Sequence, residues 1–266
     1  MADAILPAEE GRSADISYNY RLLDLCLRFG TKMLASGAET SRVEDSVIRI
    51  LGAYGKKSCS AFAIPTLLLI TFQDEDESIF TSSRRIVNRG TDFHRLDSLN
   101  SLSRALCTGE RKSLDFFSSH LEDIAAIVNY SRPVLLIAAV FVAMGFAYVF
   151  GSNIQDILIA GGVACGMKLI YELLNDAKLN STYIILMSSF LAGFSIETMA
   201  NWNWIQNPSI VTVSVVMNLV PGMLLTTSIY DIVNKDFTSG LNKLVESTFI
   251  ALALAIGTGI AVILVR

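Results

Sequence analysis

The stretch NPSIVTVSVVMNLVPGMLLTTSIYDIVNKDFTSGL, residues 207–241, organises the interpretation of the whole chain. It begins as an apolar run of about 20 residues, the length that spans a bilayer. Pro221 removes a backbone donor and its ring clashes with the carbonyl four residues earlier, while Gly222 lets the backbone turn and lets another group approach. A lipid-facing helix cannot leave the freed carbonyl unpaired, so we expect a break that faces protein or a water-filled cavity.

Two interpretations of this break remain open. Transporters often build a substrate site from a broken helix with a polar residue beside it, and Asn218 lies shortly before Pro221. Asp231, at the inner end of the same span, is then the preferred candidate for proton or substrate coupling, because ionisable residues in spans are costly. The alternative is a proline kink that serves packing only.

Lys168 and Glu172 are further candidates for a substrate or coupling site, since both lie in an expected span. They are also one helical turn apart and near the end of that span. The same spacing therefore fits an ion pair in which Lys168 extends toward the interface.

The composition indicates a membrane protein with a soluble part. Of the 266 residues, 52% are hydrophobic and 17% charged, and the mean hydropathy is +0.48. Most of the charge precedes Arg132 and nearly all the long apolar runs follow it. A formal net charge of -4 gives no reason to expect a nucleic-acid partner. The acidic N-terminus lacks the apolar core of a signal peptide.

No metal or cofactor is predicted. The two histidines and four cysteines lack the paired spacing of a zinc site, and we expect the cysteines to be free thiols in a reducing compartment. The four acids at 74–77 fit a solvated hairpin tip better than a cation site. Gly-x-Ser-x-Gly, His-Glu-x-x-His and Walker motifs do not occur, which disfavours an enzyme or an ATP-driven pump.

The soluble part is predicted to be an α+β domain. Gly37 is expected to end a first helix in the left-handed conformation. Ser41 and Glu44 have the spacing of a capping box that opens a second helix. We expect disorder over 1–15, the α+β domain over 16–112 with strands at 58–64, 66–72 and 78–87, and an amphipathic connecting helix over 113–132.

An all-α transmembrane domain is predicted over 133–266. Arg132, Lys178, Lys235 and Lys243 fall on one side of the expected spans, while the connections on the other side carry no lysine or arginine. The positive-inside rule then predicts a multi-pass protein of the plasma (inner) membrane with a cytoplasmic N-terminus and an outside C-terminus. The five expected spans are 133–150, 154–174, 182–200, 208–230 and 247–265.

Small residues recur at four-residue spacing in two of these spans. Gly162 and Gly166 do so in the second, and Gly257 and Ala261 in the fifth. This spacing is typical of helices that pack closely in lipid. The pattern predicts helix association without identifying what is transported.

Several short motifs, in register along most of the chain, resemble the threonine/serine exporter (ThrE) family, and most closely its split YjjP-type subunit. The motifs are Gly37-Ala38-Glu39-Thr40-x-Arg42-Val43-Glu44, Thr81-Ser82-x-Arg84, Arg89-Gly90 with His94, Val220-Pro221-Gly222, Asp231 and Gly240.

The resemblance implies a cytoplasmic N-terminal domain and secondary export of small metabolites. These are threonine and serine in fused members, and succinate, a dicarboxylate, in split ones. Fused members carry a second five-span block, so this chain is expected to need a separate five-span, YjjB-like partner, or to form a homo-oligomer. Two rivals remain: a membrane-anchored ligand sensor, and a membrane-bound hydrolase that uses Glu39, Glu44 or His94.

Overall fold

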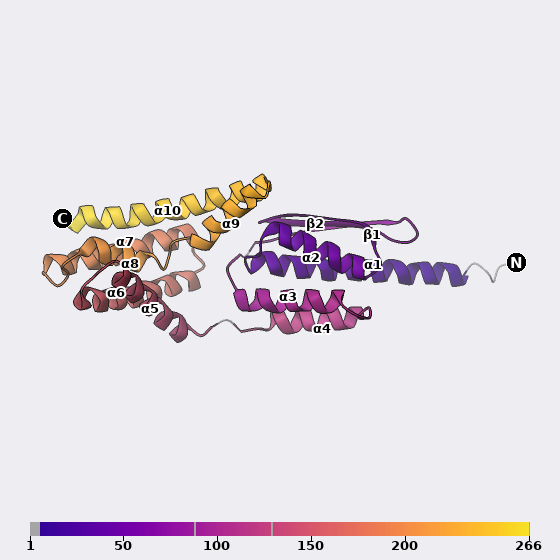
Figure 1. Cartoon of the computed structure of the whole chain (residues 1–266), viewed down its shortest axis with the longest axis horizontal. Coiled ribbons are helices and arrows are strands. Elements are labelled where there is room, and N and C mark those ends of the chain that lie inside the picture. The colour runs from indigo at the N-terminus through magenta and orange to yellow at the C-terminus, as the bar shows by residue number, and fades with distance from the viewer. Residues whose placement is uncertain (1–5, 88, 129, 266) are drawn as a thin grey trace. The chain divides into compact units, whose positions relative to one another are not determined.

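The computed structural model describes residues 6–87, 89–128 and 130–265, with side chains from residue 15 onward (Figure 1). Its internal contacts divide the chain into two compact units. Unit 1 comprises Met1–Val128 together with Thr227–Asn242, and unit 2 comprises Asn129–Thr226 together with Lys243–Arg266. Unit 1 therefore contains a segment from the far end of the chain, which the sequence analysis assigned to the transmembrane domain.

Helix α1 (Leu6–Ala35) starts ten residues earlier than expected. A proline is compatible with the first turn of a helix, which allows this start beside Pro7. The expected disorder of 1–15 therefore does not describe 6–15, and residues 1–5 lie outside the described part. At its other end Gly37 has φ +91°, and the Ala38 N–H donates to the Met33 carbonyl at 3.0 Å. This Schellman geometry confirms the left-handed cap.

Helix α2 (Thr40–Ala53) does not begin with the predicted capping box. Its N-cap is Glu39, and no side chain caps it. Because the helix starts at Thr40, Ser41 already lies inside the first turn and cannot act as a cap. The Glu44 carboxylate instead accepts a hydrogen bond from the Ala63 backbone N–H at 2.7 Å. The capping-box prediction is therefore wrong.

The three predicted strands form one antiparallel sheet in the order β1-β2-β3. Along the middle strand, buried Leu68, Ile70 and Phe72 alternate with more exposed residues, as a half-buried strand requires. In Figure 1, α1 and α2 lie along one face of the sheet. The strands are β1 (Lys57–Ile64), β2 (Leu67–Gln73) and β3 (Ile79–Arg85).

Helices α3 (Phe93–Cys107) and α4 (Leu114–Ala125) make a third layer, beyond α1 and α2. Asp92 and Ser113 cap their starts through side-chain bonds to backbone N–H groups. The connecting helix was expected to extend over 113–132. The observed helix, α4, ends at Ala125. Its apolar face ends with buried Ile124, whereas Val128 is 90% exposed. Of the described residues from 125 to 128, only Ile127 is partly buried, where it packs on the core of unit 1.

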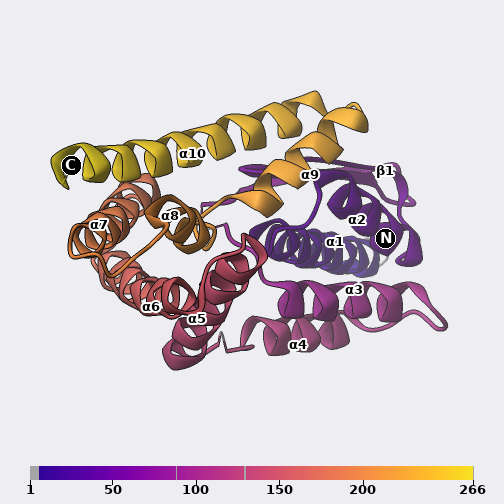
Figure 2. The same cartoon turned by 60° about the vertical axis from the view of Figure 1, so that its left-hand side comes forward.

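Unit 2 is built from apolar helices that run beside one another (Figure 2). Within the described residues, four helices are long and apolar enough to cross a membrane. The fourth expected span, 208–230, is two short helices instead of one long one, as the expected break at Pro221 allows. The four are α5 (Arg132–Val149), α6 (Ile154–Asp176), α7 (Ser181–Asn201) and α10 (Phe237–Val265); the short pair is α8 (Pro208–Val216) and α9 (Gly222–Val233).

The two small-residue faces differ in unit 2. A Cβ on Gly257 would clash with the Ser189 hydroxyl of α7, and one on Gly193 would lie 3.1 Å from the Ala261 Cβ. These small residues let α7 and α10 approach closely, as the spacing predicted. In contrast, a Cβ on Gly162 or Gly166 would meet nothing within 4 Å. The Gly162/Gly166 face of α6 is therefore open within the described part of the chain.

Candidate functional site

The predicted break is present in the fourth expected span. Helix α8 ends at Val216 and α9 begins at Gly222, with turns and irregular backbone between them. The Asn218 side-chain amide donates to the carbonyl of Val215 at 3.1 Å and so satisfies one carbonyl at the end of α8. The Thr226 hydroxyl satisfies the Gly222 carbonyl at 2.9 Å in the same way. The break therefore has local polar partners, as a membrane-buried break requires.

Gly222 does not play the role expected of it. Its φ is not in the left-handed region, and a Cβ there would meet nothing within 4 Å. The close approach predicted at this glycine is found instead at Gly240 of α10. A Cβ on Gly240 would lie 2.5 Å from Cγ1 of Ile232 and 3.0 Å from the Ser228 carbonyl.

The end of α9 and the start of α10 form a tight corner, residues 227–242, which belongs to unit 1. The buried Ser228 hydroxyl donates to the Gly240 carbonyl at 2.8 Å, and the Asp236 N–H donates to the Asp231 carbonyl at 2.9 Å. Asp231 itself is 1% exposed. We call this segment the α9–α10 corner. The coupling candidate Asp231 thus lies inside a compact turn at the end of α9.

The α9–α10 corner packs on the first turn of α2 and on β1. The Thr40 hydroxyl donates to Oδ2 of Asp236 at 2.6 Å, and the Ser239 hydroxyl donates to the Ala63 carbonyl at 3.4 Å. Thr40 and Ser239 are both completely buried. The Ala63 N–H also donates to Glu44 of α2. Ala63 of β1 therefore binds both the corner and α2. The first family motif and the region around Asp231 and Gly240 therefore meet in space.

The Glu44 carboxylate lies near other negative charge in this contact. Burial raises the pKa of Glu44 above its usual value, and the nearby Asp236 and Asp45 raise it further. The Ala63 N–H opposes the shift because it stabilises the charged form. Burial is thus the main reason that the pKa of Glu44 is raised, and Asp236 of the corner adds to it.

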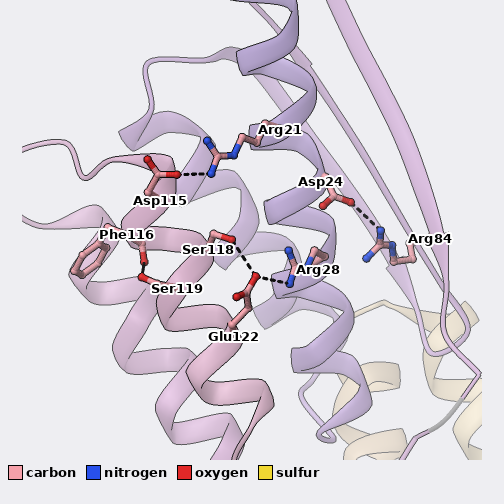
Figure 3. A network of polar contacts seen from close by, with 9 residues as sticks. All are labelled: Arg21, Asp24, Arg28, Arg84, Asp115, Phe116, Ser118, Ser119 and Glu122. Carbon is pink, nitrogen blue, oxygen red and sulfur yellow. Dashed lines mark hydrogen bonds and ion pairs between the residues drawn. The ribbon is translucent and has the colours of Figure 1, made fainter.

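The remaining motif residues of unit 1 have separate positions. Gly37 approaches the Gly90 backbone, where a Cβ would lie 3.0 Å from the Gly90 carbonyl. Arg84 pairs with Asp24 of α1 at 2.8 Å in an exposed ion pair, one of three that α1 makes in Figure 3. Arg42, Arg89 and His94 are exposed.

The hydrolase residues are not brought together. Glu44 contacts Ala63, Glu39 starts α2 without a side-chain cap bond, and His94 is exposed on α3. Within the described residues, no hydrogen bond or ion pair joins two of the three. Nor do three His, Cys, Asp or Glu side chains gather there in a way that could hold a metal ion. The geometry gives no support to the hydrolase alternative.

Lys168 and Glu172 form the ion pair that the sequence allowed. Their charged atoms are 2.8 Å apart, and the Lys168 ammonium also lies 4.7 Å from the centre of the Tyr171 ring. All three residues are on α6. The pair is local to one helix, which is the structural alternative to a substrate site.

Asp156 was missed by the sequence analysis. This carboxylate in the first turn of α6 is fully buried and accepts from the backbone N–H groups of Gln206 and Asn207, at 3.1 and 3.0 Å. It thereby fixes the loop that leads into α8. The usable signal was an Asn153-x-x-Asp156 helix start, since Asn153 caps α6 by accepting from the Asp156 N–H at 2.8 Å.

Comparison with known proteins places these features in a family. Residues 24–265 match the family model described as "Putative threonine/serine exporter". The chain is 23% identical over 247 residues to a "Probable threonine/serine exporter" of Mycobacterium tuberculosis, covering 91% of this chain and 46% of that protein. It thus spans about half the length of that relative.

A second relative has nearly the same length as this chain. It is the "Probable succinate transporter subunit YjjP" of Klebsiella aerogenes, 23% identical over 255 residues, or 93% of this chain and 95% of that protein. No solved structure gives a significant match. The names of both relatives describe transport rather than an enzymatic reaction.

Proposed function

The chain belongs to the threonine/serine exporter family, and from this we propose that it is one subunit of a secondary exporter of small polar or anionic metabolites. Four long apolar helices together with the family match make it a multi-pass membrane protein. The proposed substrates are threonine and serine, or a dicarboxylate such as succinate, after the names of the two relatives.

The observation that carries this proposal is the continuous path from the break to unit 1. Helix α9 leads from the irregular segment after Val216 to the α9–α10 corner, where Asp236 binds Thr40. A helix that only anchors a sensor does not need a polar break in its middle. A transporter does, because broken helices supply backbone groups to a substrate and allow one part to move against another.

The proposed topology has five crossings, the fourth made by α8 and α9 together. Helices of nine and twelve residues rise about 14 and 18 Å, so neither crosses a bilayer alone. The clustering of Arg132, Lys178, Lys235 and Lys243 supports a cytoplasmic unit 1 and an outside C-terminus in the inner membrane. Arg266 lies outside the described residues.

Asp231 remains our candidate for coupling. It is buried in the α9–α10 corner, at the opposite end of α9 from Pro221. We expect the environment of the Asp231 charge to change when α9 moves. Asp231→Asn keeps the shape of the side chain and removes the charge, so coupled export should fall while assembly of the protein is retained.

The proposed partner is a separate five-span subunit that packs against the open face of α6. A groove of about 300 Å³ runs beside Gly162 and Gly166, between α6 and α7. Glycines at this spacing permit close helix contact in lipid, and among the described residues a Cβ on either glycine would meet nothing within 4 Å. The M. tuberculosis relative is about twice as long as this chain, which is consistent with a second block in fused members.

Export from vesicles tests the role of the break. Pro221→Ala restores the backbone donor and removes the ring clash, so α8 and α9 should tend to join and export of labelled threonine, serine or succinate should fall. Pro208→Ala is the matched control, because Pro208 stands at the start of α8, where proline is tolerated. Equal export by Pro221→Ala and the unchanged chain would remove the main support for the proposal.

A further inference from the structure

A cleft of about 860 Å³ opens in unit 1, away from the α9–α10 corner. It is lined by residues of α1, the turn between α2 and β1, the tip of the β2–β3 hairpin and the loop between α3 and α4. The export function proposed above does not use it. The lining residues that matter for its chemistry are Asn19, Tyr54, Lys56, Asp74, Glu75 and Arg111.

The floor of the cleft contains an ion pair that is almost completely buried. The Lys56 ammonium lies 2.6 Å from Oδ1 of Asp74, with side chains only 7% and 15% exposed. The Asn19 amide also donates to Asp74. Although burial alone would raise it, these hydrogen bonds hold the pKa of Asp74 below its usual value. The Asp74 charge is therefore already compensated and is not what a ligand would neutralise.

Two buried oxygen atoms at the cleft lack a partner. The Tyr54 hydroxyl and Oδ1 of Asn19 make no hydrogen bond to any described residue, although these residues are only 1% and 2% exposed. Burial raises the pKa of Tyr54 to about 12, so its hydroxyl keeps its proton. An amide oxygen can only accept hydrogen bonds, so a ligand group that pairs with Oδ1 of Asn19 must be a donor. Such unsatisfied buried groups are uncommon in folded proteins and call for an explanation.

Arg111, on the wall of the cleft, lies over the rings of Tyr18 and Tyr54. Its guanidinium lies 5.5 Å from the centre of the Tyr18 ring and 5.3 Å from that of Tyr54, and it donates to the Tyr18 hydroxyl at 2.8 Å. The planar fork of arginine is suited to binding a carboxylate through two parallel bonds. Movement of this exposed side chain toward a ligand would open a route to the Tyr54 hydroxyl.

The rest of the rim is acidic. Asp15, Glu75 and Asp76 line the cleft, and because Lys56 already pairs with Asp74, these three carboxylates face Arg111 as the remaining cationic side chain of the lining. This balance favours a ligand with a positive group and disfavours one with two carboxylates. A cation on the ligand would also supply the donor that Oδ1 of Asn19 requires.

We propose that this cleft binds a small zwitterion of the free α-amino acid class. The ligand carboxylate pairs with Arg111, its ammonium lies among the acidic rim and Oδ1 of Asn19, and the Tyr54 hydroxyl completes the contact. The site lies in the unit without a complete spanning helix, so it senses the ligand rather than conducts it. It does not depend on the export function, and either can fail without the other.

Binding to the purified full chain in detergent tests the proposal. Isothermal titration and thermal unfolding would be measured with serine and threonine as zwitterions, succinate as a dicarboxylate and putrescine as a diamine. We expect saturable binding and a raised Tm with the zwitterions, both lost in Arg111→Met. A response to succinate or putrescine that is also lost in Arg111→Met would overturn the charge assignment, and binding of none of the four probes would overturn the site.

Two variants separate a ligand role from a structural role. Arg111→Met should weaken zwitterion binding at least about tenfold, whereas Arg104→Met, which changes another exposed arginine, should leave it unchanged. Tyr54→Phe should weaken binding without lowering the Tm of the ligand-free protein, because the removed hydroxyl had no partner. Binding that survives both Arg111→Met and Tyr54→Phe contradicts the proposal. Pro221→Ala should bind normally, since the break is not part of this site.

Discussion

The Thr40 hydroxyl donates a 2.6 Å hydrogen bond to Asp236, joining residues 196 positions apart in the chain. Thr40 starts α2 of unit 1, and Asp236 turns the chain from α9 into α10. The acceptor is a carboxylate, so the bond is of the stronger, charge-assisted kind. It links a motif near the start of the sequence to the helix that follows the break around Pro221.

Thr40→Val should loosen this link, because it keeps the side-chain shape and removes the donor. We expect a loss of about 1–2 kcal/mol in the stability of unit 1 and reduced export. Asp236→Asn should have a similar effect, and the double variant should be little worse than either single one. Thermal unfolding of the four purified proteins completes the cycle. Additive losses would show that the two residues act independently.

Gly240→Ala should open the α9–α10 corner. The added Cβ would lie 2.5 Å from Cγ1 of Ile232 and 3.0 Å from the Ser228 carbonyl, and backbone cannot move as a flexible side chain can. We expect a loss of about 1–3 kcal/mol, seen as a lower Tm. Gly259→Ala on the same helix is the control, because its Cβ would meet nothing within 4 Å. Equal Tm values for the two variants would contradict the close packing.

Glu44 should give stability a pH dependence of definite sign. Its pKa is raised in the folded protein, so the folded state holds the proton more tightly than the unfolded state. The stabilisation is therefore complete below the ordinary value of 4.5 and is lost as the pH rises through the higher folded value. Glu44→Gln should flatten this part of the Tm–pH curve, whereas Asp97→Asn, at an exposed carboxylate of α3 that does not contribute to this shift, should not. A curve unchanged by Glu44→Gln would refute the assignment.

Much of the fold could be predicted because its signals are local. The three strands and the left-handed Gly37 of unit 1, and the break around Pro221 in unit 2, each follow from a few neighbouring residues. The capping-box prediction was wrong because it too used only a local signal. Ser41 and Glu44 have the right spacing, but Glu44 finds the Ala63 N–H, which only the folded sheet presents. The place of the α9–α10 corner in unit 1 depends on the contact between Thr40 and Asp236, which no local pattern encodes.

Gly166→Leu should weaken assembly with the partner while leaving the chain itself stable. A Cβ at Gly166 meets nothing within 4 Å in this chain, so the larger side chain enters the open groove beside α6. Co-purification of the partner should fall, with little change in Tm. Gly257→Leu is the contrasting variant, since it must displace Ser189 of α7 and should lower the Tm of the chain. Normal assembly of Gly166→Leu would place the partner elsewhere.

Thiol labelling in intact cells tests the orientation. In a chain whose four native cysteines are replaced by serine, a membrane-impermeant reagent should label Asn203→Cys and not Asn234→Cys. Both positions are exposed in the structure, so access depends on the side of the membrane. The opposite pattern would reverse the proposed topology.

Flux through proteoliposomes tests the central proposal most directly. Vesicles would hold this purified chain alone, the candidate five-span partner alone, or both, and release of labelled threonine, serine and succinate would be followed under an imposed ion gradient. We expect saturable, gradient-driven export only when both proteins are present. The same export from this chain alone would contradict the two-component account, and no export from any of the three preparations would contradict the assignment as an exporter subunit.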